Sequence, residues 1–127
     1  MTKGIETYLD GTEVTGGYAR AIKIGDRIIV SGTTSLDKSG KVMGATAVEQ
    51  TEIVMDKIVK AISHFGAGIP NLVKVNIFVA DVKDGTPVSK KVMEICAPHR
   101  HASTGVAAAG LFVPGLLVEI QAEAVLF

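Results

Sequence analysis

Glu119 is the carboxylate whose neighbours in the sequence best suit it to acid–base chemistry. Leu117 and Val118 precede it and Ile120 follows it, so its surroundings are largely apolar. Such surroundings raise the pKa of a carboxyl group and suit it to work as a general acid or base. A structural role is the alternative, because Glu119, Gln121 and Glu123 alternate along one strand and would form a partly wetted sheet face.

Two further side chains are candidate nucleophiles. Ser31 precedes Gly32 at the end of a β-branched run, but no Gly-x-Ser-x-Gly elbow surrounds it, which favours a polar residue at a strand end. Cys96 has Lys90 and Lys91 nearby, and cations of this kind can lower a thiol pKa. A small apolar residue on the buried side of a helix is the favoured interpretation of Cys96.

Metal and phosphate sites find little support. His99 and His101 flank Arg100, but the third histidine, His64, lies far away in the sequence. A zinc site needs more ligands than two imidazoles, so we expect a solvated basic connector here. The glycines at 16–17 and 66–68 match neither a Walker motif nor a dinucleotide fingerprint and indicate turns.

The elements that must position these residues begin with a hairpin. Residues 18–24 and 27–32 are rich in β-branched side chains and flank a turn at Gly25 and Asp26. Residues 33–45 then contain a run of turn-forming residues at 37–40 and are predicted to form a loop.

Two amphipathic helices follow. The first spans residues 46–65 and ends at Gly66 and Gly68. Its apolar stripe, with Thr51 filling one gap, comprises Val48, Met55, Ile58, Ile62 and Phe65. Thr86 as N-cap and Pro87 at the first helical position predict a second helix to about residue 97, which Pro98 stops. Its buried face comprises Val88, Val92 and Ile95.

Three more strands, at residues 72–80, 102–109 and 116–127, complete the order β-β-α-β-α-β-β. This order predicts an α+β fold with a mixed sheet, both helices on one face, and one domain over residues 1–127. Six apolar side chains are expected to point to both faces of the sheet: Ile28, Ile29, Val30, Val75, Ile77 and Val79. The face without helices therefore needs a cover, and a second copy of the chain is the expected one.

Composition excludes several classes of partner. Thirteen basic and thirteen acidic residues give a net charge of zero, and no basic cluster is longer than two residues, so nucleic acid is not expected as a partner. No window approaches the ~20 apolar residues of a membrane span. The first residues also lack the apolar core of a signal peptide, and we expect a cytoplasmic protein.

Five segments, in this order and spacing, resemble the RidA/YjgF family, also labelled the endoribonuclease L-PSP family. They are residues 17–22, 28–32, 50, 72–79 and 117–122. The resemblance covers nearly the whole chain. It implies a chorismate-mutase-like fold assembled as a homotrimer, with the sheets facing inward and a small-molecule ligand bound in clefts between subunits.

The resemblance also implies an activity, namely hydrolysis of reactive enamines and imines left by PLP-dependent dehydratases, giving a 2-keto acid and ammonia without metal or cofactor. A carboxylate at the position of Glu119 helps to place water, and a tyrosine at the position of Tyr18 lines the cleft. In archetypal members an arginine clamps the substrate carboxylate. Here Ser103 stands at that position, followed by Thr104 and Gly105.

Ser103 changes the expected ligand, because serine offers one hydroxyl and no charge. Ser89 likewise stands at the position of a pocket asparagine. We therefore expect a ligand that lacks an amino-acid-like carboxylate or that is held through hydroxyls and backbone amides. Arg100 could replace the missing guanidinium only through a register shift that would disturb the alternation of the following strand.

Two classes of function follow. An enzyme would hydrolyse a small imine or enamine with Glu119 as general base, while Ser31 or backbone amides near Gly32 and Gly105 polarise the substrate. A non-catalytic module would bind a small metabolite in the same cleft. Ribonuclease activity is the least favoured, because the net charge is zero and no histidine-based acid–base pair is evident.

Overall fold

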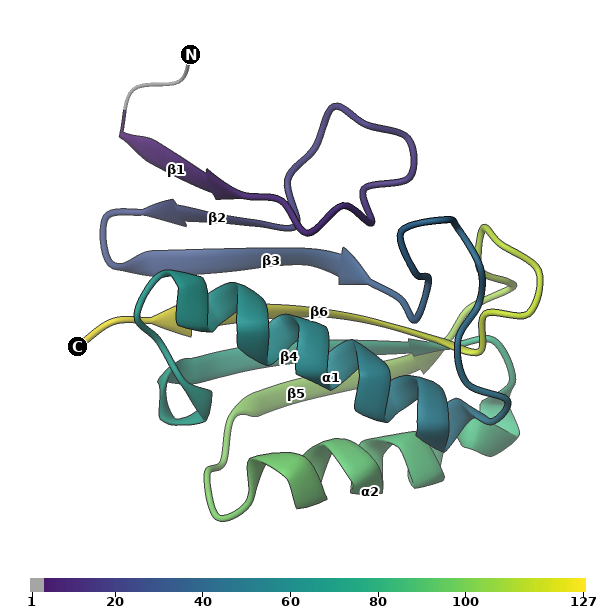
Figure 1. Cartoon of the computed structure of the whole chain (residues 1–127). Helices are drawn as coiled ribbons and strands as arrows, with labels where there is room; N and C mark the ends of the chain where they lie inside the picture. The colour runs from purple at the N-terminus through teal and green to yellow at the C-terminus, as the bar shows by residue number, and fades with distance from the viewer. Residues whose placement is uncertain (1–3) are drawn as a thin grey trace.

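A mixed sheet carries both long helices on one of its faces (Figure 1). The computed structural model describes residues 4–127, and within them six strands lie in the order β1-β2-β3-β6-β4-β5. Their bounds are Ile5–Tyr8 (β1), Ala21–Ile24 (β2), Arg27–Thr33 (β3), Leu72–Val79 (β4), Ala102–Ala107 (β5) and Val118–Val125 (β6). Only the β4–β5 pair is parallel. The predicted mixed α+β architecture is confirmed.

Helix α1 (Ala47–His64) forms where the sequence predicts it. A capping box starts it, since the Thr46 hydroxyl accepts from the Glu49 N–H at 3.1 Å and the Glu49 carboxylate accepts from the Thr46 N–H at 3.0 Å. Its stripe packs on β3 and β6, and its buried members are Ala47, Gln50, Thr51, Val54, Met55, Ile58, Ala61 and Ile62.

Helix α2 (Gly85–Cys96) begins two residues earlier than the sequence suggests. Thr86 is therefore not the N-cap, and Pro87 is the third helical residue, where its missing N–H costs nothing because the first helical N–H groups have no intrahelical acceptor. Cys96 is buried on the inner face with Val88 and Val92, and burial raises the pKa of its thiol. The apolar interpretation of Cys96 holds.

The N-terminal part of the sheet differs from the prediction. Strand β1 was not predicted, because four half-exposed residues carry too weak a periodic signal. Tyr18 lies in a loop, and β2 begins only at Ala21. The Arg20 N–H donates to the Tyr8 carbonyl at 2.9 Å, which closes residues 9–19 into a loop between β1 and β2.

The expected excess of apolar side chains on the open face is wrong for five of the six residues. Residues two apart on a strand share a face, and Ile28, Val30, Val75, Ile77 and Val79 are all buried beneath the helices. Only Ile29 of the six faces the other way. The open face is mixed, since strand β6 presents Glu119, Gln121 and Glu123 there as predicted.

Gln50 ties α1 to the start of β6. Its Nε2 donates to the carbonyls of Gly44 and Gly115 at 3.1 and 3.0 Å, and its Oε1 accepts from the Leu117 N–H at 2.8 Å. The side chain is buried, so these bonds satisfy backbone groups that water does not reach. Gln50 thereby holds the loop that leads into Glu119.

Replacing Gln50 with leucine should lower the free energy of unfolding by about 3 kcal/mol, because three buried backbone groups lose their partners. Urea denaturation measures the change. Gln121→Leu, on the exposed side of β6, is the control and should cost about 0.5 kcal/mol or less. Equal effects of the two substitutions would contradict the assigned role of Gln50.

Candidate functional site

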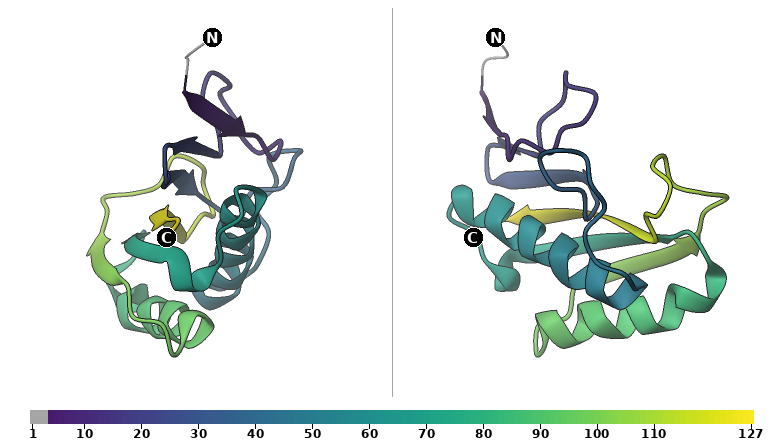
Figure 2. Two further views of the ribbon diagram at one scale, coloured as in Figure 1. Left: turned by 90° about the vertical axis from the view of Figure 1, so that its left-hand side faces the viewer. Right: turned by 45° about the vertical axis from the view of Figure 1, so that its right-hand side comes forward.

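Three loops gather around one end of the sheet, away from the C-terminus (Figures 1 and 2). They comprise residues 9–20, 34–46 and 108–117. Between them lies a cavity of about 310 Å³, whose walls include Tyr18, Ser31, Gly32, Phe112 and Glu119. A second cavity of about 310 Å³ shares Gly32, Phe112 and Glu119 with the first. We call these two neighbouring cavities together the Glu119 cleft.

Glu119 enters the cleft over a bulge in β3. The register of β3 on β6 shifts between Val30 and Thr33, so that the pairing steps over Ser31 and Gly32. The Glu119 carboxylate lies directly against Gly32, where a Cβ atom would overlap its Oε2. Glycine at this position makes room for the carboxylate.

The Glu119 carboxyl group is about half-buried and shares its face of the sheet with Gln121. Burial raises the pKa of Glu119 above its ordinary value, and the positive charge of Arg20 opposes that rise. A carboxylate with a raised pKa binds a proton more readily near neutral pH, which is the property a general base needs.

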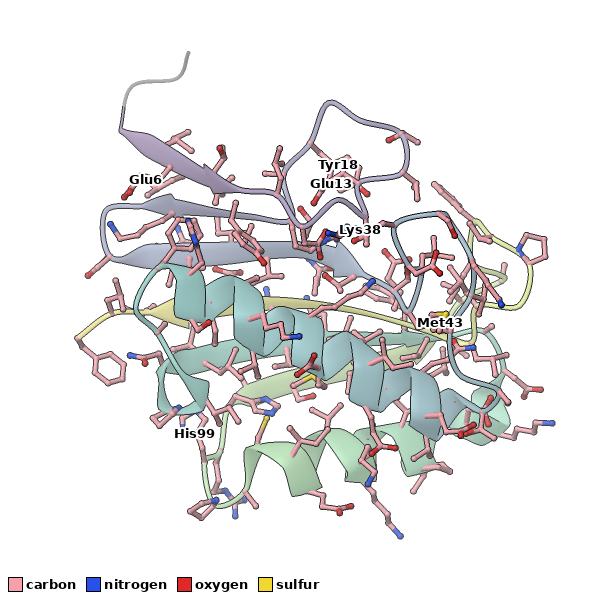
Figure 3. All side chains as sticks on the ribbon, viewed as in Figure 1. Glu6, Glu13, Tyr18, Lys38, Met43 and His99 are labelled. Carbon is pink, nitrogen blue, oxygen red and sulfur yellow. The ribbon has the colours of Figure 1, made fainter. Side chains whose placement is uncertain are left out.

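Tyr18 and Ser31 line the same cleft. Tyr18 is 38% exposed, and Figure 3 shows it beside Glu13 on the loop that precedes β2. The Ser31 hydroxyl donates to the Ala19 carbonyl at 2.7 Å. The Ser31 hydroxyl proton is therefore already used in a hydrogen bond to this loop and is not available to polarise a ligand.

Arg20 and Asp10 form a buried ion pair that the sequence analysis does not predict. The Arg20 Nε lies 3.4 Å from an oxygen of Asp10 and 3.9 Å from one of Glu13. Burial raises the pKa of Asp10, but hydrogen bonds from Thr12, with smaller effects of Glu13 and Arg20, outweigh it and lower the pKa to about 2. The one signal in the sequence was a charged residue between Ala19 and Ala21 in an otherwise apolar run.

Ser103 does not lie near Glu119 within one chain. Glu119, Phe78 and Val106 are level across β6, β4 and β5. Ser103 precedes Val106 by three residues, so its Cα lies about 10 Å along the strand and about 10 Å across the sheet from that of Glu119. It also pairs with Val75, which faces the helices, so its side chain belongs to the opposite face.

Thr104 and Gly105 are also separated from the Glu119 cleft. All six residues of the edge strand β5 are exposed. A groove of about 490 Å³ runs between β5 and α2, and its walls include Gly105, Ser89 and Met93. The structure thus groups the predicted residues into two sets, one at the cleft and one along the β5 edge.

The basic segment before β5 lies far from Tyr18 (Figure 3). The His99 Nε2 is 2.6 Å from the Leu72 carbonyl, a contact that requires this nitrogen to donate, and Arg100 is exposed. Neither enters the Glu119 cleft.

Among residues 4–127, no three His, Cys, Asp or Glu side chains are grouped so that they could hold a metal ion. No helix in that range is long and apolar enough to cross a membrane.

A family model for endoribonuclease L-PSP matches residues 10–126. The chain belongs to the endoribonuclease L-PSP family. The match begins at Asp10 and includes every residue of the Glu119 cleft and of the β5 edge named above. The predicted RidA/YjgF resemblance is confirmed.

Relatives of this endoribonuclease L-PSP family member support the assignment. Protein SCO2049 of Streptomyces coelicolor is 30% identical over 112 residues, which cover 88% of this chain and 84% of that protein. RutC family protein PYRAB12510 of Pyrococcus abyssi is 28% identical, with 86% of each chain covered. The crystal structure of Rv2704 from Mycobacterium tuberculosis, a member of the YjgF/YER057c/UK114 family, superposes with a TM-score of 0.86 at 29% identity, over 96% of this chain and 99% of that one.

Gly32→Ala should cost about 2 kcal/mol of stability in the wild-type background, because the new methyl group must displace the Glu119 carboxylate. In a Glu119→Ala background the same substitution should cost much less. Urea denaturation of both single variants and the double variant gives the coupling energy, which we expect to be at least about 1 kcal/mol.

Gly110→Ala is the matched control for this cycle, since nothing lies within 4 Å of the position its Cβ would take. It should show no coupling to Glu119→Ala. Additive effects of Gly32→Ala and Glu119→Ala would mean that the two residues are not in contact.

Proposed function

We propose that this family member hydrolyses a small imine in the Glu119 cleft and releases ammonia, with Glu119 as general base. The observation that carries the proposal is the half-buried Glu119 carboxylate, which lies against Gly32, lines two cavities and has a raised pKa. Enamines would enter the same reaction after tautomerising to imines.

The reaction needs one group that moves protons. Water adds to the carbon of the C=N bond while Glu119 takes one of its protons, and return of that proton to nitrogen gives a carbinolamine. The C–N bond then breaks as the hydroxyl proton moves to nitrogen, which leaves a carbonyl product and ammonia. A carboxylate with a raised pKa can both accept and return the proton.

The charges around the cleft favour a substrate without a carboxylate. Arg20 is the only cation that lines the described cleft, and its guanidinium already donates to Gly32, Thr33 and Thr12. By the family resemblance, Ser103 replaces the arginine that clamps a substrate carboxylate, and Arg20, the one guanidinium that lines the described cleft, is already bonded. A neutral or cationic imine suits the negative charge of Glu119 better.

The cleft would be completed in a homotrimer. The single-domain chain supplies Tyr18, Gly32 and Glu119 at the cleft, and it exposes residues 103–105 on an edge strand. An exposed strand edge without charged side chains is suited to contact with another copy. We propose that β5 of one copy covers the Glu119 cleft of the next.

A non-catalytic binding module is the second candidate, and one observation favours it. The Ser31 hydroxyl already donates to the Ala19 carbonyl, so it is not available as a donor beside Glu119.

The endoribonuclease activity in the family name has less support, since the cleft offers no exposed cation for a phosphodiester. The cytoplasm remains the proposed compartment, although the relative mmf1 of Schizosaccharomyces pombe is named as mitochondrial.

Ammonia release distinguishes these functions. The substrates are 2-aminoacrylate and a carboxylate-free imine made in situ from a primary amine by an amine oxidase. Wild type should accelerate hydrolysis of the second imine, and Glu119→Ala should lose about 100-fold of that acceleration. Ser103→Arg should gain activity on 2-aminoacrylate.

Wild type that binds the imine without accelerating its hydrolysis would reject the enzyme and favour the binding module. A wild type with high activity on 2-aminoacrylate would instead contradict the proposed preference for substrates without a carboxylate.

Light scattering checks the assembly. The expected mass is three times the 13.3 kDa of one chain. A monomeric mass at micromolar concentration would contradict the proposal that two copies form each cleft.

A further inference from the structure

Arg20 is a buried arginine that the proposed hydrolysis does not use. Its Nη1 donates to the Gly32 carbonyl at 2.8 Å and reaches the Thr33 hydroxyl at 3.3 Å. Its Nη2 donates to the carbonyl and the hydroxyl of Thr12, both at 3.1 Å. One guanidinium thus joins the bulge of β3 to the loop of residues 9–20.

This loop forms one wall of the Glu119 cleft through Thr12 and Tyr18. Its other hydrogen bonds between residues 10 and 18 stay inside the loop, for example from the Gly16 N–H to the Glu13 carbonyl. Among the described residues, the hydrogen bonds that leave residues 10–18 for the rest of the fold go to Arg20, and the next residue, Ala19, accepts from the Ser31 hydroxyl. The position of Thr12 in the wall therefore depends on the guanidinium, while Ser31 holds the end of the loop that follows Tyr18.

Arg20 lines the same cavity as Glu119, and its positive charge acts on the Glu119 carboxyl group. Asp10 and Glu13 lie 3.4 and 3.9 Å from its Nε, with side chains only 15% and 9% exposed. Tyr18 is the other titratable group of the cleft, and Cζ of Arg20 lies 5.7 Å from its ring centroid. On the neighbouring strand β4, the residue opposite Glu119 is Phe78, and its side chain carries no charge.

We propose that Arg20 is the positioning residue of the Glu119 cleft, because it holds the wall with Thr12 and Tyr18 against the Gly32 end of β3 and places a positive charge behind the Glu119 carboxylate. Its side chain is 3% exposed and its guanidinium is already bonded to Thr12, Gly32 and Thr33, so we expect it to act through these neighbours. The inference deepens the proposed function and rests on the same cleft, but its test needs no substrate. Failure of the ammonia assay and failure of this test are therefore separate results.

Three variants separate the charge of Arg20 from its geometry. Arg20→Gln removes the charge, and Arg20→Lys keeps the charge but cannot reach Thr12 and Gly32 together. Arg27→Gln is the control, since Arg27 starts β3, the strand that contains Gly32, and pairs with Glu123 at the other end of β6 from Glu119. Carbon-detected NMR measures the Glu119 carboxyl pKa, and hydrogen exchange measures the amides of Thr12 and Gly16.

Arg20→Gln should raise the Glu119 pKa by about one unit, because the opposing positive charge is gone. Arg20→Lys should leave that pKa close to its wild-type value. Both variants should speed exchange at Thr12 and Gly16 by about tenfold or more. Arg27→Gln should change neither measurement.

An unchanged Glu119 pKa in Arg20→Gln, or unchanged exchange of the loop in Arg20→Lys, would overturn the proposal. If Arg20→Gln does not fold, Thr12→Val keeps the test decisive. This variant removes the hydroxyl that accepts from Arg20 and donates to Asp10, while leaving every charge in place. It should speed amide exchange at Gly16 without changing the Glu119 pKa. An exchange rate equal to that of the wild type would contradict the positioning role of Arg20.

Discussion

The contact between the Glu119 carboxylate and Gly32 is the constraint on which the rest of the site depends. It requires a glycine in β3, a bulge that steps over Ser31 and Gly32, and a strand β6 that starts in the right register. Gln50 of α1 binds the backbone just before β6, and Arg20 binds the Gly32 carbonyl in the bulge of β3. Buried polar side chains, each bonded to backbone groups, thus hold a carboxylate where packing alone would not.

Much of the fold could be predicted from the sequence because it rests on local periodicity. The helices at 47–64 and 85–96 and the alternation of β6 follow from spacings of three, four and two. The prediction of an apolar open face was wrong because a run such as Ile28-Ile29-Val30 does not reveal which side chains the helices cover. Strand β1 and the loop before β2 depend on long-range contacts, and periodicity is silent about those.

The candidate site could be predicted only in part. Glu119, Tyr18, Ser31 and Gly32 meet in one cleft, whereas Ser103 lies on another strand and the opposite face. The resemblance supplied these positions together, since a family pattern does not distinguish residues of one chain from residues of two. Arg20 was missed because its partners Asp10 and Thr12 precede the strand it was assigned to, and nothing in their spacing predicts an ion pair.

A crystal structure of the assembled protein would show whether each cleft takes its acid–base group from one copy and its cover from another, as we propose. We expect residues 103–105 of one subunit to lie over the Glu119 cleft of the next, with Tyr18 and Gly32 on the facing wall. An assembly in which every Glu119 cleft opens to solvent, with the β5 edges engaged elsewhere, would contradict it.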